Sequence, residues 1–183
     1  MESVFMRLKN SNTHYGKIAI VFHWVMVLLL VCLLMLGLYM VSLPIGLEKL
    51  KLYGWHKELG VLVLGLAMLR IAWRFCNITP SLAYLPLWEI VAARCTHWAF
   101  YLLMFALPLS GWIMSSAAGL PVSFFGLFVL PDLVAPDETL RILFQAIHQW
   151  LGYAIIALIC LHVAAAFKHH FINKDDIMRR MLP

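Results

Sequence analysis

The sequence predicts an all-α membrane protein, a bundle of four transmembrane helices with both termini in the cytoplasm. Of its 183 residues, 63% are hydrophobic and only 13% are charged, and the mean hydropathy is +0.88. This is the composition of an integral membrane protein and not of a soluble domain. Four apolar stretches are each long enough to cross a bilayer, and basic residues gather on the segments expected on one side of it.

These stretches fit one domain that occupies residues 1–183. We expect spans at about residues 18–43, 50–75, 92–115 and 143–169, joined by short connections. The first apolar run is far longer than the hydrophobic region of a signal peptide, so we expect it to remain as an anchor. The longest connection holds the apolar run Pro121–Pro131, which is too short to span. We expect it to lie at the membrane surface as a lid over the bundle end.

The distribution of basic residues predicts the orientation. With both termini in the cytoplasm, the inner segments hold ten Lys and Arg and the outer segments hold four, which obeys the positive-inside rule. The ten are Arg7, Lys9, Lys17, Arg70, Arg74, Arg94, Lys168, Lys174, Arg179 and Arg180, and the four are Lys49, Lys51, Lys57 and Arg141. The net charge of +5 therefore indicates orientation in a lipid bilayer, and no nucleic-acid partner is expected.

Two histidines lie inside the fourth apolar stretch, His148 and His162, 14 residues apart. At about 100° and 1.5 Å per residue, a helix places them within about 40° of one face and about 21 Å apart. Two further histidines, His23 and His56, lie about two turns inside the first and second spans. Imidazole in hydrocarbon is costly unless it is paired or binds a ligand.

Depth divides these four histidines into two pairs. His23 and His162 lie near the cytoplasmic edge, whereas His56 and His148 lie near the outer edge. Each pair can hold one haem iron from both sides of the macrocycle, which leaves no open position and favours electron transfer. The alternatives are lone histidines bonded to neighbouring helices, or a proton relay in a channel or transporter. A zinc or copper site lacks further ligands, and no cysteine lies in a C-x-x-C motif.

Two glycines each lie on the same helix face as a histidine. Gly37 follows His23 by 14 residues, and Gly111 follows His97 by 14 residues. A porphyrin needs room against a helix, which glycine gives, although close packing of membrane helices uses glycine in the same way.

Polar residues are expected at the cytoplasmic end of the bundle. Arg70 follows His56 by 14 residues, at the depth of the inner pair, where it can bind a haem propionate or extend to the interface. A cationic pocket that bears histidines can hold a quinone and supply protons for its reduction. The candidates for that pocket are His97, Arg94, Arg74 and His169. Anchoring of these charges at the interface is the alternative.

Seven short motifs follow one another along the chain. They are FHW (Phe22–Trp24), WHKELG (Trp55–Gly60), LRIAWR (Leu69–Arg74), HWAFYLLMFALPLSGW (His97–Trp112), HQWLGY (His148–Tyr153), LHVAAAFKHHF (Leu161–Phe171) and R-x-x-P (Arg180–Pro183). Over nearly the whole chain they resemble the bacterial cytochrome b561 family, which is related to the cytochrome b subunits of nickel–iron hydrogenases. The resemblance implies two non-covalent b haems, on His23 with His162 and on His56 with His148. It also implies a multi-pass protein of the bacterial plasma membrane that exchanges electrons with a quinone such as ubiquinone in a respiratory chain.

Two alternative functions remain open. Some members of this family oxidise superoxide and pass the electron to ubiquinone, and that subgroup has lysines between helices two and three. Asn77–Trp88, the corresponding segment, holds no lysine. The other alternative is an anchor or adaptor subunit for a dehydrogenase or hydrogenase, with a redox partner protein. No separate catalytic residue is expected in any of these functions.

Overall fold

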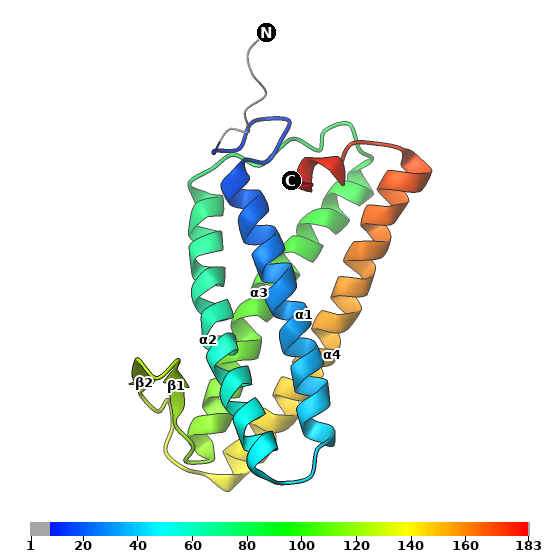
Figure 1. Ribbon diagram of the computed structural model, residues 1–183. Helices are drawn as coiled ribbons and strands as arrows, with labels where there is room; N and C mark the ends of the chain where they lie inside the picture. Colours follow the sequence, from blue (N-terminus) through cyan, green and yellow to red (C-terminus); the bar gives the residue numbers. More distant parts are fainter. Residues whose placement is uncertain (1–7, 183) are drawn as a thin grey trace.

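The computed structural model describes residues 8–182, so Arg7 and Pro183 lie outside it. The helices are α1 (Lys17–Ser42), α2 (Leu47–Phe75), α3 (Leu87–Ala117) and α4 (Glu138–Phe167). A π-helix, Lys168–Asn173, continues α4, and a 3-10 turn, Arg179–Met181, follows it. Figure 1 shows the long helices side by side, with the described chain beginning and ending at the same end, here called the terminal end. The expected all-α architecture with four long helices is confirmed.

Two helices begin earlier than the hydropathy predicts. α3 begins at Leu87 and α4 at Glu138, each five residues before the expected span. Asp137 caps α4, because its carboxylate accepts a hydrogen bond from the backbone N–H of Leu140 at 2.9 Å. Pro86 precedes α3 in an extended conformation. A capping bond therefore marks the start of α4 and a proline that of α3, whereas hydropathy reports only the apolar part of each helix.

Among the described residues, three helices are long and apolar enough to cross a membrane: α1, α3 and the continuous helix 138–173. α2 differs because it carries seven charged residues in its first twelve and last six positions. They are Glu48, Lys49, Lys51, Lys57, Glu58, Arg70 and Arg74. The apolar part of α2 is thus the stretch from Leu59 to Leu69, and its role as a span stays a prediction.

The connection between α3 and α4 contains a β-hairpin that the sequence analysis did not predict. Strand β1 (Val122–Phe124) pairs antiparallel with β2 (Phe128–Leu130), and Phe125 and Gly126 turn the chain with φ of 49° and 70°. β1 packs against α2 and α3, at the side of the bundle in Figure 1, and does not cover its end as expected. The Nζ atom of Lys57 in α2 donates to the Pro121 carbonyl at 2.7 Å.

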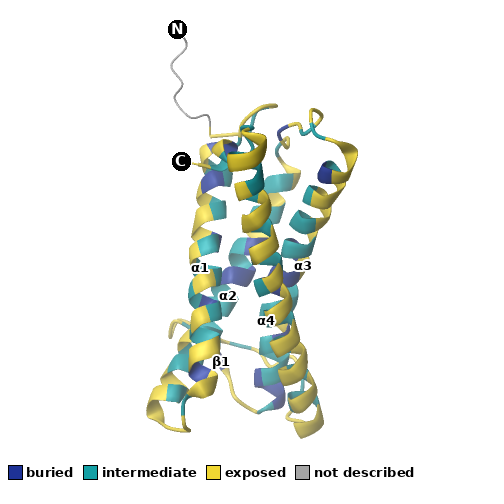
Figure 2. Ribbon diagram, turned by 90° about the vertical axis from the view of Figure 1, so that its right-hand side faces the viewer, coloured by how far each residue is buried: buried dark blue, intermediate teal, exposed yellow. Residues whose placement is uncertain are grey.

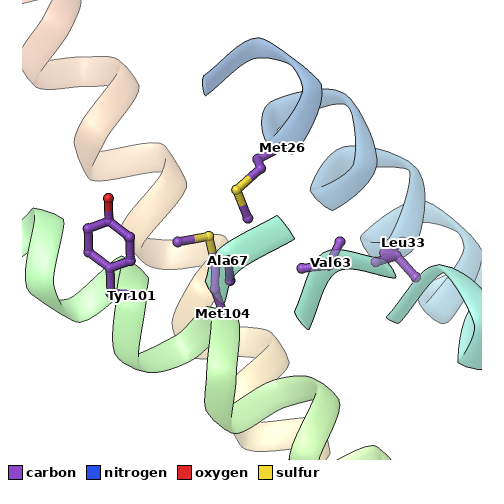
Figure 3. Close-up of a cluster of buried hydrophobic side chains, with 6 residues drawn as sticks. All are labelled: Met26, Leu33, Val63, Ala67, Tyr101 and Met104. Atoms are coloured by element: carbon purple, nitrogen blue, oxygen red, sulfur yellow. The ribbon is translucent and has the colours of Figure 1, made fainter. Parts of the chain in front are cut away.

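The buried core lies between α1, α2 and α3. Figure 3 shows its members: Met26, Leu33, Val63, Ala67, Tyr101 and Met104. α4 contributes one fully buried residue, Ile155. It packs along α3, with at most slight backbone contact to α1 or α2. The two pairs of adjacent helices, α1 with α2 and α3 with α4, are therefore joined mainly through the α2–α3 contact.

The outer faces of the bundle are apolar. Exposed residues run along the outside of each helix in Figure 2, and large apolar side chains such as Leu28, Leu102 and Trp150 are at least 65% exposed. A soluble monomer rarely exposes such continuous apolar surface, whereas a lipid bilayer covers it. The surface thus agrees with a membrane protein.

The terminal end is closed by a network between three segments that are distant in sequence. Arg180 is 9% exposed and donates to the Ser81 carbonyl at 2.9 Å and to the Asp176 carboxylate at 3.1 Å. Its guanidinium also lies over the Tyr84 ring, 5.1 Å from the centroid. Trp24 in α1 donates to the backbone carbonyl of Met181 at 2.8 Å. The C-terminal tail is thereby fixed to the α2–α3 loop and to α1.

We predict that Arg180→Gln frees the C-terminal tail without disturbing the helices. Each hydrogen bond of a charged group that is lost costs about 1.5–3 kcal/mol. Limited proteolysis should then cut the tail faster at neutral pH. Arg179→Gln is the matched control, because Arg179 is exposed and next in sequence. Equal cleavage of both variants and the unmodified chain would show that the tail is held by other contacts.

Acid should weaken the same network. The hydrogen bond from Arg180 holds the pKa of the Asp176 carboxyl below its ordinary value. A lowered carboxyl pKa stabilises the folded form above the ordinary pKa, and this stabilisation is lost as the pH falls through the lowered value.

Candidate functional site

The four predicted histidines lie in two pairs across the interior of the bundle. His23 in α1 faces His162 in α4, with ring centroids 6.3 Å apart. His56 in α2 faces His148 in α4, with centroids 6.1 Å apart. We call them the terminal-end pair (His23 and His162) and the hairpin-end pair (His56 and His148). α4 contributes one imidazole to each pair.

The separation of each pair fits two imidazoles on one metal. An imidazole nitrogen binds a metal at about 2.0 Å, so two rings on opposite sides of it have centroids about 6 Å apart. No group of three or more His, Cys, Asp or Glu arranged for a metal ion occurs between residues 8 and 182. Two protein ligands suit a metal whose other ligands come from a macrocycle, as in haem, and do not suit bare zinc.

A hydrogen-bond network fixes His148 in the hairpin-end pair. Its Nδ1 lies 3.0 Å from the Leu107 carbonyl and 3.0 Å from Oγ of Ser110, both in α3. A carbonyl oxygen only accepts, so Nδ1 carries the hydrogen and Nε2 keeps its lone pair. That is the tautomer of a histidine that binds a metal through Nε2 and is oriented by a backbone carbonyl.

Two glycines make room for the rings of the hairpin-end pair. A Cβ on Gly111 would lie 3.2 Å from Cε1 of His148, and a Cβ on Gly37 would lie 3.3 Å from Cε1 of His56. Both glycines thus let an imidazole lie against the neighbouring helix, whereas the sequence suggested room for a porphyrin. Nδ1 of His56 is buried and has no hydrogen-bond partner in the described chain.

Guanidinium groups lie beside the terminal-end pair. Nη2 of Arg70 lies 3.4 Å from Nδ1 of His23, and within residues 8–182 Arg70 forms no ion pair. Arg70 and Arg74 both lie over the Tyr101 ring, 5.9 and 5.7 Å from its centroid. Arg74 also lies 5.5 Å from the centroid of the Trp98 ring. Within residues 8–182, Arg70 and Arg74 therefore bring positive charge to this end of the interior without an ion pair to either of them.

The residues predicted to form a quinone pocket lie in different surroundings. The ring centroid of His97 lies 6.0 Å from that of His162, so His97 adjoins the terminal-end pair. Arg74 lies over aromatic rings near it. Arg94 is exposed, and Nδ1 of His169 lies 2.6 Å from the Asp175 carboxylate. Within the described chain no contact joins all four residues.

The structure adds a buried carboxylate that the sequence analysis missed. Glu89 is 8% exposed, and its Oε1 accepts from Nζ of Lys168 at 2.5 Å. Nε2 of His169 lies 3.9 Å from its other oxygen. Glu89 was missed because the expected third span began after it. Ser110 was also missed, although Pro108, Ser110 and Gly111 together marked an irregular stretch of α3.

Comparison with known proteins shows the family of the chain. Residues 14–183 match the model of a protein family described as "Prokaryotic cytochrome b561". "Cytochrome b561 homolog 2" of Escherichia coli (strain K12) is 36% identical over 186 residues, which covers 97% of this chain and 95% of that protein. "Cytochrome b561 homolog 1" of the same organism is 34% identical over 132 residues, 70% of this chain and 73% of that protein.

A third relative bears a more specific name. "Probable superoxide oxidase CybB" of Yersinia pestis is 33% identical over 129 residues, 70% of this chain and 73% of that protein. The family match extends over nearly the whole chain and includes all four paired histidines. The chain therefore belongs to the prokaryotic cytochrome b561 family, membrane proteins that transfer electrons by means of b-type haem.

Proposed function

We propose that this protein carries electrons across the membrane through two b haems, each held by two histidines. The observation that carries the proposal is the presence of two facing imidazole pairs, 6.3 and 6.1 Å between centroids, on opposite halves of one bundle. A bound haem would supply a change between Fe(III) and Fe(II), and two histidine ligands would leave no position for another ligand. His23 and His162 would hold one haem, and His56 and His148 the other.

The bundle length suits two separate sites. His148 and His162 lie 14 residues apart on α4, which separates them by about 21 Å along the helix axis. That distance places one site near each face of a hydrocarbon core about 30 Å thick. This arrangement requires α2 to cross the membrane as the fourth span, with its charged residues near the two faces. The ten-to-four charge asymmetry supports an orientation with both termini in the cytoplasm of a bacterial cell.

Arg70 is proposed to bind a haem propionate at the terminal end. Its guanidinium lies in the interior beside His23, forms no ion pair between residues 8 and 182, and has five N–H donors. A buried cation without a carboxylate is costly, and a propionate would neutralise it with paired hydrogen bonds. Nη2 contacts His23 and Nη1 donates to the sulfur of Met26 at 3.8 Å, which leaves further N–H groups for a propionate.

A quinone is the proposed partner at the terminal end. His97 adjoins His162, and Arg74 lies nearby over Trp98 and Tyr101, which supports a cationic, aromatic site for a quinone head group. His169 and Arg94 lie farther out, where they would supply protons or anchor the bundle. An imidazole beside a quinone oxygen can donate the hydrogen that the reduced quinone needs.

Superoxide as electron donor is the second candidate. The name of the Yersinia pestis relative favours it. The absence of lysine from Asn77–Trp88 argues against the route that the superoxide-oxidising subgroup suggests. Quinone reduction measured with superoxide, and separately with a chemical electron donor, distinguishes superoxide oxidation from general electron transfer.

The ligand proposal predicts two haems whose binding depends on different histidines. The purified protein should contain two b haems per chain by reduced-minus-oxidised spectrum and haem assay. His148→Ala and His162→Ala should each lose about half of the pigment, and the double variant should lose nearly all of it. His170→Ala is the control, because His170 belongs to neither pair. Full pigment in the double variant would disprove the ligand assignment.

The glycine contacts predict a site-specific steric effect. Gly111→Ala should force the His148 ring away from α3 and weaken the hairpin-end site, at a cost of about 1–3 kcal/mol for overpacking. The measurement is the temperature at which the visible haem band disappears. Gly65→Ala is the control, because nothing lies within 4 Å of its added Cβ and Gly65 is on the face of α2 opposite His56. Equal loss temperatures of the haem band in both variants would contradict a steric role of Gly111 beside His148.

The quinone proposal predicts that His97 is needed for the reduction of quinone and not for the reduction of the haems. His97→Gln should keep both haems and slow quinone reduction by about 10²-fold, the lower range for a lost proton donor. Haem reduction by a chemical donor should be unchanged. His14→Gln, in the exposed N-terminal segment, is the control. Unchanged quinone reduction in the His97 variant would remove this residue from the site.

A further inference from the structure

The two histidine pairs face opposite kinds of polar group. At the hairpin end, Nδ1 of His148 meets two acceptors, the Leu107 carbonyl and Oγ of Ser110, each at 3.0 Å. At the terminal end, Nδ1 of His23 meets a cation, with Nη2 of Arg70 at 3.4 Å. The difference lies in neighbours on α2 and α3, since the rings themselves have nearly the same separation in both pairs.

We propose that these neighbours set the reduction potentials of the two sites apart, with the hairpin-end site lower and the terminal-end site higher. This inference rests on the proposed function, because it assumes a haem on each pair. It assigns to Ser110 the role of a positioning residue that acts through His148, and to Arg70 the role of a nearby positive charge; neither residue binds the metal.

The acceptors lower the potential at the hairpin end. A hydrogen bond from Nδ1–H to a carbonyl increases the electron density on the imidazole and makes Nε2 a stronger donor to a metal. A stronger donor stabilises the more positive, oxidised metal. The hydroxyl of Ser110 donates its hydrogen to the Leu107 carbonyl at 2.8 Å, so a lone pair of the same oxygen faces His148. Both oxygens therefore act on the ring in the same direction.

The guanidinium raises the potential at the terminal end. A nearby cation favours the redox state with less positive charge, which is the reduced one. Arg70 lies inside the bundle, where salt screens it little, and Arg74 adds a second positive charge over the same Tyr101 ring. A propionate bound to Arg70 would otherwise carry its negative charge uncompensated, so the cation raises the potential in that case as well.

The cation nearest in sequence to the hairpin-end pair lies elsewhere. Lys57 follows His56 directly, but its ammonium donates to the Pro121 carbonyl at 2.7 Å and to Oγ of Ser115 at 3.3 Å, at the base of the hairpin. Arg141 at the same end forms an ion pair with Glu138. Neither makes a hydrogen bond to a histidine of this pair.

A consequence is a direction for electron flow. One electron moves favourably from the lower-potential, hairpin-end site, which is oxidised, to the higher-potential, terminal-end site, which is reduced. No bond is formed or broken and no proton is required. With the orientation that the basic residues predict, this flow runs from the outer face toward the cytoplasm.

The test is a redox titration of the purified, haem-loaded protein, followed in the visible spectrum. We expect two waves, of which His148→Ala abolishes the lower and His162→Ala the upper. Arg70→Gln should lower the upper wave, with at least a tenfold change in the reduced-to-oxidised ratio at fixed potential, about 59 mV for one electron. Arg70→Lys should restore most of the potential that the upper wave loses in Arg70→Gln. Ser110→Ala should raise the potential of the lower wave, seen as a severalfold change in the reduced-to-oxidised ratio at fixed potential. Ser110→Thr should restore the original potential.

Matched controls separate these effects from general damage. Ser42→Ala removes the same kind of hydroxyl-to-carbonyl bond, 2.8 Å to Tyr39, far from either pair, and should move neither wave. Arg141→Gln removes a guanidinium at the hairpin end and should leave the upper wave in place. If Arg70→Gln does not bind haem, the Ser110 variants and the two single histidine variants still decide the order of the waves.

Three outcomes would overturn the inference. One is two bound haems with the upper wave lost in His148→Ala, which reverses the order and leaves the proposed function intact. Another is two bound haems whose waves respond to neither Ser110→Ala nor Arg70→Gln, which also leaves that function intact. The third is a protein with fewer than two haems, in which case both the proposed function and this inference fail.

Discussion

The cost of placing an imidazole in hydrocarbon governs the interior of this bundle. A transmembrane helix satisfies its own backbone groups, so each buried ring must find a partner on another helix. His148 finds one in the Leu107 carbonyl and Ser110, and His23 lies beside Arg70. Nδ1 of His56 finds none among the described residues. The separation of each facing pair fits two imidazoles on one metal, and a haem on each pair is the proposed partner of these rings.

The packing of the helices is uneven around the histidine pairs. The buried core joins α1, α2 and α3, whereas α4 rests mainly on α3 and approaches α1 and α2 through its histidines. Ordinary packing would have closed α4 onto α1 and α2 with apolar side chains. Gly37 and Gly111 also favour the imidazoles, because at each of them the ring of a neighbouring helix lies where a side chain would be. The interior is thus shaped around the rings and not around a continuous apolar core.

Helix periodicity explains why much of this was predictable. The 14-residue spacing of His148 and His162 fixes one face and one separation for any straight helix, and apolar length fixes the number of helices. Contacts that depend on the rotation of one helix against another were not predictable, and the bond from His148 to Ser110 is one of them. The pairing of Glu89 with Lys168 joins residues 79 apart in sequence. The hairpin was missed because its strands have three residues each and its position depends on contacts with α2.

The difference between the two ends follows from the orientation that the sequence predicts. The predicted orientation has basic residues near the cytoplasmic ends of the spans, and Arg70 and Arg74 at the end of α2 fit this prediction. The structure turns both guanidinium groups inward over Tyr101, beside the terminal-end pair. The hairpin end has fewer cations, and the ammonium of Lys57 there donates to the carbonyl of Pro121, in the loop that contains the hairpin. In the orientation that the basic residues predict, these same charges would make the interior change from neutral acceptors at His148 to positive charge at His23.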